Sequence, residues 1–294
     1  MKVLCAIDGS RRSQWALDWL PHVCSPEHDA LLLVHAVDMT QYKTLSQMDQ
    51  KSRSALVKVL EFSLEGAARL LEWAEFKASK SWGQVRAKLL RGSPAEAIAR
   101  FAEREKADLL VVGSRGVTEF QPMLLGTVSR KLLMNAPCPV LLVKKPAAPL
   151  KRIVLGADGS IDSWKSVTLL KRLPSEVRPG VTVASVIPPL PLESLRVPAR
   201  ALAVCNQVEG TLRHEVQKLA TRVAGTLRQA GFSAKGVVLS GSPGAELVEL
   251  AGRERANLVV IGSRGGRSPQ EYFLGSVADT VVKYAPCSVL VYRR

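Results

Sequence analysis

This chain of 294 residues lacks several features that mark other classes of protein. Aromatic residues make up only 5% of it, and they do not alternate with basic residues as they do in RNA-binding modules. It has no run of about 18 uncharged apolar residues, and no basic leader with an apolar core opens the sequence. We therefore expect a cytoplasmic protein without a membrane span, and nucleic-acid binding is not favoured despite a net charge of +15.

Patterns of catalytic and metal-binding residues are equally scarce. The four His residues have no metal-ligand spacing, and the five Cys residues form no C-x-x-C pair. The phosphate-binding sequence G-x-x-x-x-G-K-[ST] and the dinucleotide fingerprint G-x-G-x-x-G are missing. No Ser-His-Asp pattern is readable. These absences predict a protein that is not an enzyme and has no catalytic residues or metal ligands among its side chains.

The chain does contain, twice, the pattern G-x-x-G, nine residues, and then G-[S/T]. The first copy runs from Gly113 to Thr127 and the second from Gly262 to Ser276. Each copy follows an apolar run typical of a buried strand and ends where a helical pattern begins. Glycine lets a backbone approach a phosphate closely, and a helix N-terminus offers N–H groups and a favourable dipole. The pattern therefore indicates two phosphate-binding loops.

These loops belong to a longer repeat with an offset of about 149 residues. The sequences D-G-S, G-S-P and A-P-C recur in the same order in both halves. This period has the size of a domain and is too long for a solenoid repeat. We predict two homologous domains, residues 1–146 and 150–294, joined by a stiff, proline-bearing linker at residues 145–149.

Within each half, apolar runs alternate with helical stretches. In the first half we expect strands at residues 2–7, 30–37, 85–90, 108–113 and 140–144. Continuous Val, Leu and Ile runs predict strands buried on both faces, and their alternation with helices predicts a parallel sheet. The predicted fold is α/β, with two tandem doubly wound domains, each a five-stranded parallel sheet of order 3-2-1-4-5 with helices on both faces. Residues 188–203 are expected to form a surface loop.

The ligand site of a doubly wound sheet lies beyond the carboxyl ends of the strands, where the strand order reverses. Asp8 and Asp158 end the first strand of each half, and Gly113 and Gly262 end the fourth. Each aspartate either accepts hydrogen bonds from a ribose or an adenine, or caps the following helix as part of D-G-S. Both roles remain open at this point.

Together, these motifs resemble the ATP-binding branch of the universal stress protein family, over nearly the whole chain. The resemblance implies domains of the adenine nucleotide alpha hydrolase type in a stress-response regulator or sensor that binds ATP, with Mg²⁺ on the phosphates. It also implies an intramolecular pseudo-dimer through the last strands of the two halves, and a further homodimer remains open. A slow ATPase, or an adaptor whose pocket holds another ligand, is the alternative.

The resemblance assigns nucleotide-binding positions in both halves. In the first half these are Ala6, Asp8, Ala36, Val112, Gly113, Arg115, Gly116, Gly126, Thr127, Val128 and Ser129. In the second half they are Asp158, Val186, Ile261, Gly262, Arg264, Gly265, Gly275, Ser276 and Val277. Arg115 and Arg264 either reach phosphate or face solvent. Ala278 stands where the first half has Ser129, so the second half lacks one hydroxyl.

Overall fold

A computed structural model of the chain describes residues 1–40, 42, 49–116, 125–174, 176–189, 199–263 and 274–293. It divides into two compact units, Met1–Ala147 and Ala148–Arg293. Among the described residues, no helix combines the length and the hydropathy that crossing a membrane requires. Each unit contributes its own parallel strands and its own helices.

In its described residues, the first unit has five parallel strands and four helices. Its strands are β1 (Lys2–Ala6), β2 (Ala30–Asp38), β3 (Val85–Gly92), β4 (Leu109–Gly113) and β5 (Val140–Val143). Its helices are α1 (Arg11–Val23), α2 (Gln50–Ser79), α3 (Pro94–Arg104) and α4 (Thr127–Asn135). The strand order is β3-β2-β1-β4-β5, with Ala6 of β1 opposite Val34 and Val112. The predicted doubly wound fold and strand order are therefore confirmed.

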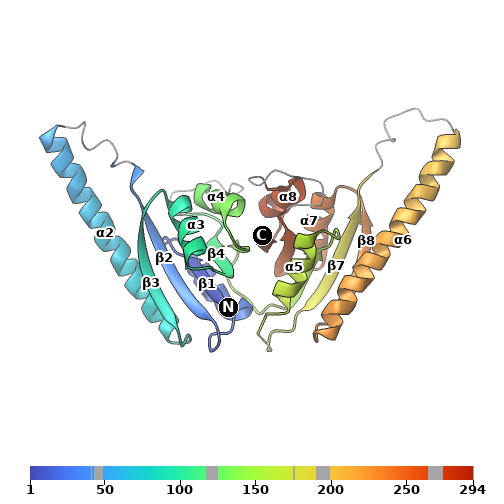
Figure 1. The fold of residues 1–294 in the computed structure, drawn as a ribbon, viewed down its shortest axis with the longest axis horizontal. Helices are drawn as coiled ribbons and strands as arrows, with labels where there is room; N and C mark the ends of the chain where they lie inside the picture. The colour runs from blue at the N-terminus through green and yellow to red at the C-terminus, as the bar shows by residue number, and fades with distance from the viewer. Residues whose placement is uncertain are drawn as a thin grey trace. The chain divides into compact units, whose positions relative to one another are not determined.

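Helices cover both faces of this sheet (Figure 1). On one face α1 packs on β4 and β5 while α2 packs on β2 and β3, and Lys77 of α2 donates to Asp18 of α1 at 2.6 Å. On the other face α3 and α4 pack against each other. Strands enclosed in this way need apolar side chains on both sides, and every residue of β4 is buried.

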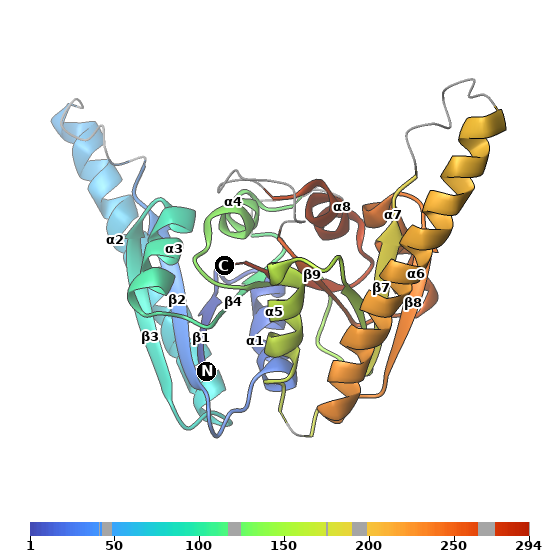
Figure 2. The ribbon, with the colours of Figure 1, turned by 45° about the vertical axis from the view of Figure 1, so that its right-hand side comes forward.

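The second unit repeats this plan. Its strands are β6 (Arg152–Gly156), β7 (Gly180–Ile187), β8 (Ala234–Ser240), β9 (Leu258–Gly262) and β10 (Ser288–Tyr292), in the order β8-β7-β6-β9-β10. Its helices are α5 (Ile161–Leu170), α6 (Ala199–Gln229), α7 (Pro243–Arg253) and α8 (Ser276–Tyr284). Figure 2 shows α6 running along β7 and β8.

One loop prediction is corrected in this unit. Residues 199–203 were expected in a surface loop, but they form the start of α6. The sequence Ala-Arg-Ala-Leu-Ala explains the helix, because these residue types have the highest helix propensities. Residues 190–198 of the same expected loop lie outside the described residues.

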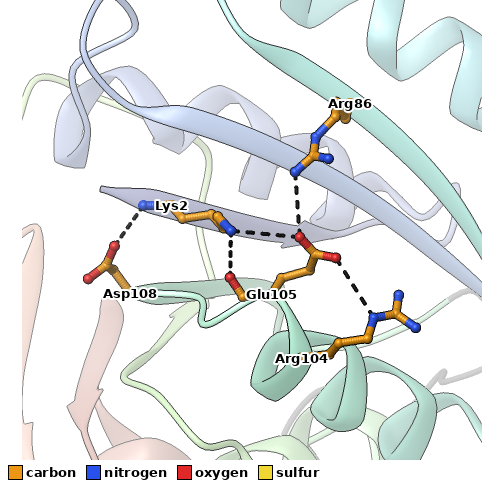
Figure 3. Close-up of polar contacts among 5 residues, drawn as sticks. All are labelled: Lys2, Arg86, Arg104, Glu105 and Asp108. Carbon is orange, nitrogen blue, oxygen red and sulfur yellow. Dashed lines mark hydrogen bonds and ion pairs between the residues drawn. The ribbon is translucent and has the colours of Figure 1, made fainter.

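Polar contacts hold together the amino ends of the first-unit strands (Figure 3). The Glu105 carbonyl accepts a hydrogen bond from Lys2 Nζ at 2.7 Å, and Asp108 accepts one from the Lys2 backbone N–H at 2.7 Å. The Glu105 carboxylate also lies 3.5 Å from Arg86 and 3.8 Å from Arg104. These contacts join β1, β3, α3 and the start of β4 at the edge of the sheet opposite to the carboxyl ends.

Candidate functional site

A cavity of about 260 Å³ lies in the first unit at the carboxyl ends of β1, β2 and β4. All eleven positions that the sequence assigned to a ligand in the first half line this cavity. Six further lining residues were not among them: Ile7, Ser13, His35, Pro94, Ile98 and Leu132. The motifs around residues 8, 36, 113 and 126, far apart in the sequence, therefore meet at one hollow.

The turn between β1 and α1 fixes the position of Asp8. Its Oδ1 accepts a hydrogen bond from the backbone N–H of Ser10 at 2.9 Å, across Gly9, whose φ is +82°. Ser10, rather than Asp8, caps α1, because its Oγ accepts from the Ser13 backbone N–H at 3.2 Å. The other carboxylate oxygen, Oδ2, faces Gly116, where an added Cβ would lie 2.8 Å away. One oxygen of Asp8 thus shapes the turn, while the other points across the site.

The glycine loop after β4 is held at both ends by the main chain. The Ser114 backbone N–H donates to the Val143 carbonyl at 2.8 Å, and the Gly126 N–H donates to the Ser114 carbonyl at 2.9 Å. Gly113 touches the backbone of α1, since a Cβ there would lie 2.9 Å from the Arg12 carbonyl carbon. Glycine is therefore required at 113 for packing, whereas at 116 it keeps space beside the Asp8 carboxylate.

Helix α4 begins at this cavity without a side-chain cap. Gly126 is its N-cap residue, and Thr127, Val128 and Ser129 form its first turn. The Ser129 hydroxyl donates to the Gly113 carbonyl at 2.6 Å and is only 6% exposed. In this structure the hydroxyl proton of Ser129 therefore joins α4 to β4, while the positive end of the helix dipole is directed at the cavity.

Three guanidinium groups gather beside the glycine loop. Burial is the main cause that lowers the pKa of Arg12, and the charges of Arg115 and Arg11 lower it further. The Arg12 Nε is buried and, among the described residues, has no hydrogen-bond partner. Arg11 and Arg12 both lie over the Trp15 ring, 5.3 and 5.7 Å from its centroid. This concentration of positive charge next to an unmet donor favours an anion at the loop.

His35 enters the site from the end of β2. Its Nδ1 lies 2.7 Å from the Ile7 carbonyl, so Nδ1 carries the proton of the neutral ring. In the second unit the Ser185 hydroxyl makes the equivalent bond, to the Ala157 carbonyl at 2.6 Å. The shared bond supports the strand ends in both units. Within the described part of the chain, no three His, Cys, Asp or Glu side chains gather where a metal ion could bind.

The second unit places its predicted positions in the same elements. The exposed Asp158 accepts from the Ser160 backbone N–H at 2.9 Å, as Asp8 does from Ser10. The other described positions lie in β7, at the end of β9 and at the start of α8: Val186, Ile261, Gly262, Gly275, Ser276 and Val277. Arg264 and Gly265 lie outside the described residues.

Apolar side chains lie closer together at the strand ends of the second unit. Gly156 takes the place of Ala6, and a Cβ added there would lie 3.1 Å from Leu247 and 3.2 Å from Ile261. Both distances are shorter than an ordinary van der Waals contact, which starts at 3.4 Å. Leu247 and Ile261 therefore occupy space that the Ala6 side chain takes in the first unit.

The charge beside the glycine loop is also reversed. Asp162 occupies the position in α5 that Arg12 occupies in α1, and its Oδ2 accepts from the Ser263 hydroxyl at 3.2 Å. Ala278 replaces Ser129 and is buried. A carboxylate at this point makes the electrostatic potential more negative, whereas the guanidinium group of Arg12 makes it more positive in the first unit. The two units thus share a backbone plan but differ in the side chains at the candidate site.

Comparisons with known proteins agree with the repeated architecture. A model of the universal stress protein family matches residues 1–144 and again residues 149–293. A universal stress protein of Methanocaldococcus jannaschii is 31% identical over 146 residues, covering 49% of this chain and 82% of the relative. One of Bacillus subtilis is 32% identical over 151 residues, covering 49% and 98%. The solved structure of a universal stress protein from Archaeoglobus fulgidus has a TM-score of 0.68 at 20% identity, covering 100% of this chain and 98% of its own, and shows a shared fold.

Proposed function

The chain belongs to the universal stress protein family, and on that premise we propose that its first unit binds ATP as a regulator of the stress response. The observation that carries this proposal is the cavity that brings Asp8, the glycine loop and the start of α4 together. Such a combination of apolar walls with a few convergent polar groups is typical of a small-molecule site.

The inner part of the cavity suits an adenosine. Ala6, Ala36 and Val112 offer small apolar surfaces against which a flat base packs. The carboxylate oxygen Oδ2 of Asp8 is a hydrogen-bond acceptor, which suits ribose hydroxyls. The missing side chain of Gly116 keeps that oxygen accessible, because a Cβ would lie 2.8 Å from it. We therefore assign the base and the sugar to this part of the cavity.

The loop end of the cavity suits the phosphates. The N-terminus of α4 provides main-chain N–H groups and a positive dipole, and Gly126 lets phosphate approach without a side chain in the way. Arg115 lines the cavity at the same end, and the charge of Arg12, which interacts with that of Arg115, adds to the positive potential there. Mg²⁺ would neutralise phosphate charge here while keeping water and phosphate oxygens as its ligands.

We propose that binding, rather than hydrolysis, is the output of the site. The guanidinium and main-chain N–H groups at the loop end stabilise phosphate but accept no proton from an attacking water, and we assign the nearby Asp8 carboxylate to the ribose. A bound ligand at a hundredfold excess over its Kd adds about 2.7 kcal/mol of stability. That amount is enough to shift a conformational or partner-binding equilibrium without chemistry.

We further propose that the second unit binds ATP more weakly. Its Asp162 places a carboxylate where the first unit has Arg12, and Leu247 and Ile261 close on Gly156. Both differences act against a nucleotide, one at the phosphates and the other at the base. The expected ratio is one tightly bound ATP per chain.

Thermal melting with and without Mg·ATP tests the site. For the wild type we expect the nucleotide to raise the melting temperature of the first unit by roughly 5–10 °C at saturating concentrations. Gly116→Val should lose this shift, because the new side chain displaces the Asp8 carboxylate. Gly83→Val is the control and should keep the shift, because nothing lies within 4 Å of a Cβ added at Gly83. An unchanged shift in Gly116→Val would rule out the proposed site.

A single-turnover assay with labelled ATP tests the proposed output separately. We expect little phosphate release over an hour from protein that ATP stabilises. Release at about 1 s⁻¹ or faster, the lower end of ordinary enzyme turnover, would make the protein an ATPase while leaving the binding site in place.

A further inference from the structure

Helix α2 has two apolar stripes, and only one of them packs against the sheet. The inner stripe is buried on β2 and β3 and consists of Ala67, Leu71, Ala74 and Ala78. On the other side, the side chains of Phe62, Trp73 and Phe76 are exposed by 70, 42 and 66%. Large apolar groups that gather on a surface often mark an interaction site.

The exposed aromatic residues share one face of the helix with a set of cations. Phe62, Trp73 and Phe76 are eleven and three residues apart, which is close to whole turns of an α-helix. The same helical spacing brings five cations to this side: Lys51, Lys58, Arg69, Lys77 and Lys80. These eight residues are called the outer face of α2 below.

Two of these cations lie against the aromatic rings. Lys77 Nζ is 5.5 Å from the centroid of the Trp73 ring and also donates to Asp18 of α1 at 2.6 Å. Lys80 Nζ is 4.6 Å from the centroid of the Phe76 ring. At this end of the helix, positive groups therefore lie directly beside the exposed rings.

The carboxylates of α2 lie mainly along one side of the outer face. Glu61, Glu65 and Glu72 are four and seven residues apart and so follow a neighbouring line along the helix. Glu65 and Arg69 approach within 4.0 Å, but both side chains are more than 60% exposed, so the pair neutralises little of the positive field. The outer face thus carries more cations than carboxylates, and an anionic partner complements it.

We propose that the outer face of α2 binds the surface of an anionic lipid bilayer. Aromatic side chains of this kind settle at the boundary between headgroups and acyl chains, while Lys and Arg extend towards lipid phosphates. Each basic residue near such a surface adds to the attraction. The 30-residue helix extends past the ends of β2 and β3 in both views of the fold (Figures 1 and 2), which lets one side of it lie along a plane.

A bilayer fits this surface better than a single-stranded nucleic acid does. Binders of single strands combine a positive groove with rings on which bases stack. Here the surface is the convex side of one helix, and ammonium groups already lie over the Trp73 and Phe76 rings. A flat, negatively charged surface needs neither a groove nor free ring faces.

Helix α6 of the second unit provides a control within the same chain. It has 31 residues and packs on β7 and β8 as α2 does on β2 and β3, but its sequence contains no Phe, Trp or Tyr. Its exposed apolar residues include Val208 and Leu212, at 42 and 39%. Binding that depends on the outer face of α2 should therefore not depend on these two residues.

Co-sedimentation with lipid vesicles tests the proposal. The wild type should sediment with vesicles of phosphatidylglycerol and phosphatidylcholine, and not with phosphatidylcholine alone. The triple variant Phe62→Ser, Trp73→Ser, Phe76→Ser keeps every charge and should lose sedimentation. The double variant Val208→Ser, Leu212→Ser should keep it. Melting curves check folding, and Phe62→Ser alone, at the most exposed of these positions, serves if the triple variant unfolds.

A second pair of changes tests the charges. Lys51→Gln with Lys58→Gln should weaken binding to the anionic vesicles roughly thirtyfold, from the contribution of each basic residue near such a surface. Equal binding to both kinds of vesicle, no binding to either, or equal loss in the α6 variant would overturn the proposal. Binding of single-stranded RNA that needs the three aromatic residues, without vesicle binding, would identify a nucleic-acid surface instead.

Discussion

Replacing Gly113 with alanine should destabilise the first unit, because the added methyl group has no space. Its Cβ would lie 2.9 Å from the Arg12 carbonyl carbon and 3.0 Å from the Ser13 nitrogen, whereas ordinary contacts start at 3.4 Å. Both are main-chain atoms of α1 and cannot rotate aside, so the helix itself has to move away from β4. Overpacking of this kind costs about 1–3 kcal/mol.

Differential scanning calorimetry measures this cost. For a unit of this size, each kcal/mol corresponds to about 2–4 °C, so the melting temperature should fall by roughly 2–12 °C. The control is Gly66→Ala in α2, where no atom lies within 4 Å of the added Cβ. Alanine favours a helix over glycine by up to about 1 kcal/mol, so this variant should melt higher. A wild-type melting temperature for Gly113→Ala would refute the packing described for β4 and α1.

One labelling experiment and two substitutions test other parts of the first unit. Cys5 and Cys138 should resist alkylation when folded, because burial raises the pKa of each thiol from 9.0 to about 12. Rapid alkylation of the folded protein near neutral pH would contradict this burial. Because the pKa of each thiol is higher in the folded state, the two thiols contribute their full stability below about pH 9 and lose it as the pH rises towards 12. Urea unfolding at several pH values measures this loss. His35→Ser should fold with a near-native melting curve, as Ser185 makes the same bond in the second unit, and a global loss of structure would count against that equivalence. Glu105→Gln should lower the free energy of unfolding by at most about 1 kcal/mol, because the cationic partners of Glu105 are partly exposed. If the free energy of unfolding depends on salt concentration in the same way in the variant and the wild type, Glu105 has no ionic role.

The sequence was sufficient to predict the doubly wound sheet. Strands and helices alternate with clear apolar runs, and this alternation permits few arrangements other than a doubly wound sheet. The positions assigned in the first half lie in or just after β1, β2 and β4 or at the start of α4, and the strand order brings them to one cavity. The pairing of the two units through their last strands stays a prediction.

Features that depend on contacts between distant segments could not be predicted in this way. The choice of Ser10 rather than Asp8 as the cap of α1 depends on the geometry of one turn. The bond from Ser129 to Gly113 and the burial of Arg12 depend on how α4 and α1 pack on β4. The reversal of charge at Asp162 is visible in the aligned halves, but its place beside Ser263 is not.

We propose that the first unit of this chain binds ATP tightly and that the second unit binds it weakly. Isothermal titration of nucleotide-free protein with Mg·ATP measures the number of sites directly. We predict one tight site per chain, which is lost in Gly116→Val and kept in Gly265→Val, the matching change in the second copy of the glycine pattern. Two equal sites, or a tight site that survives Gly116→Val and disappears in Gly265→Val, would contradict the claim.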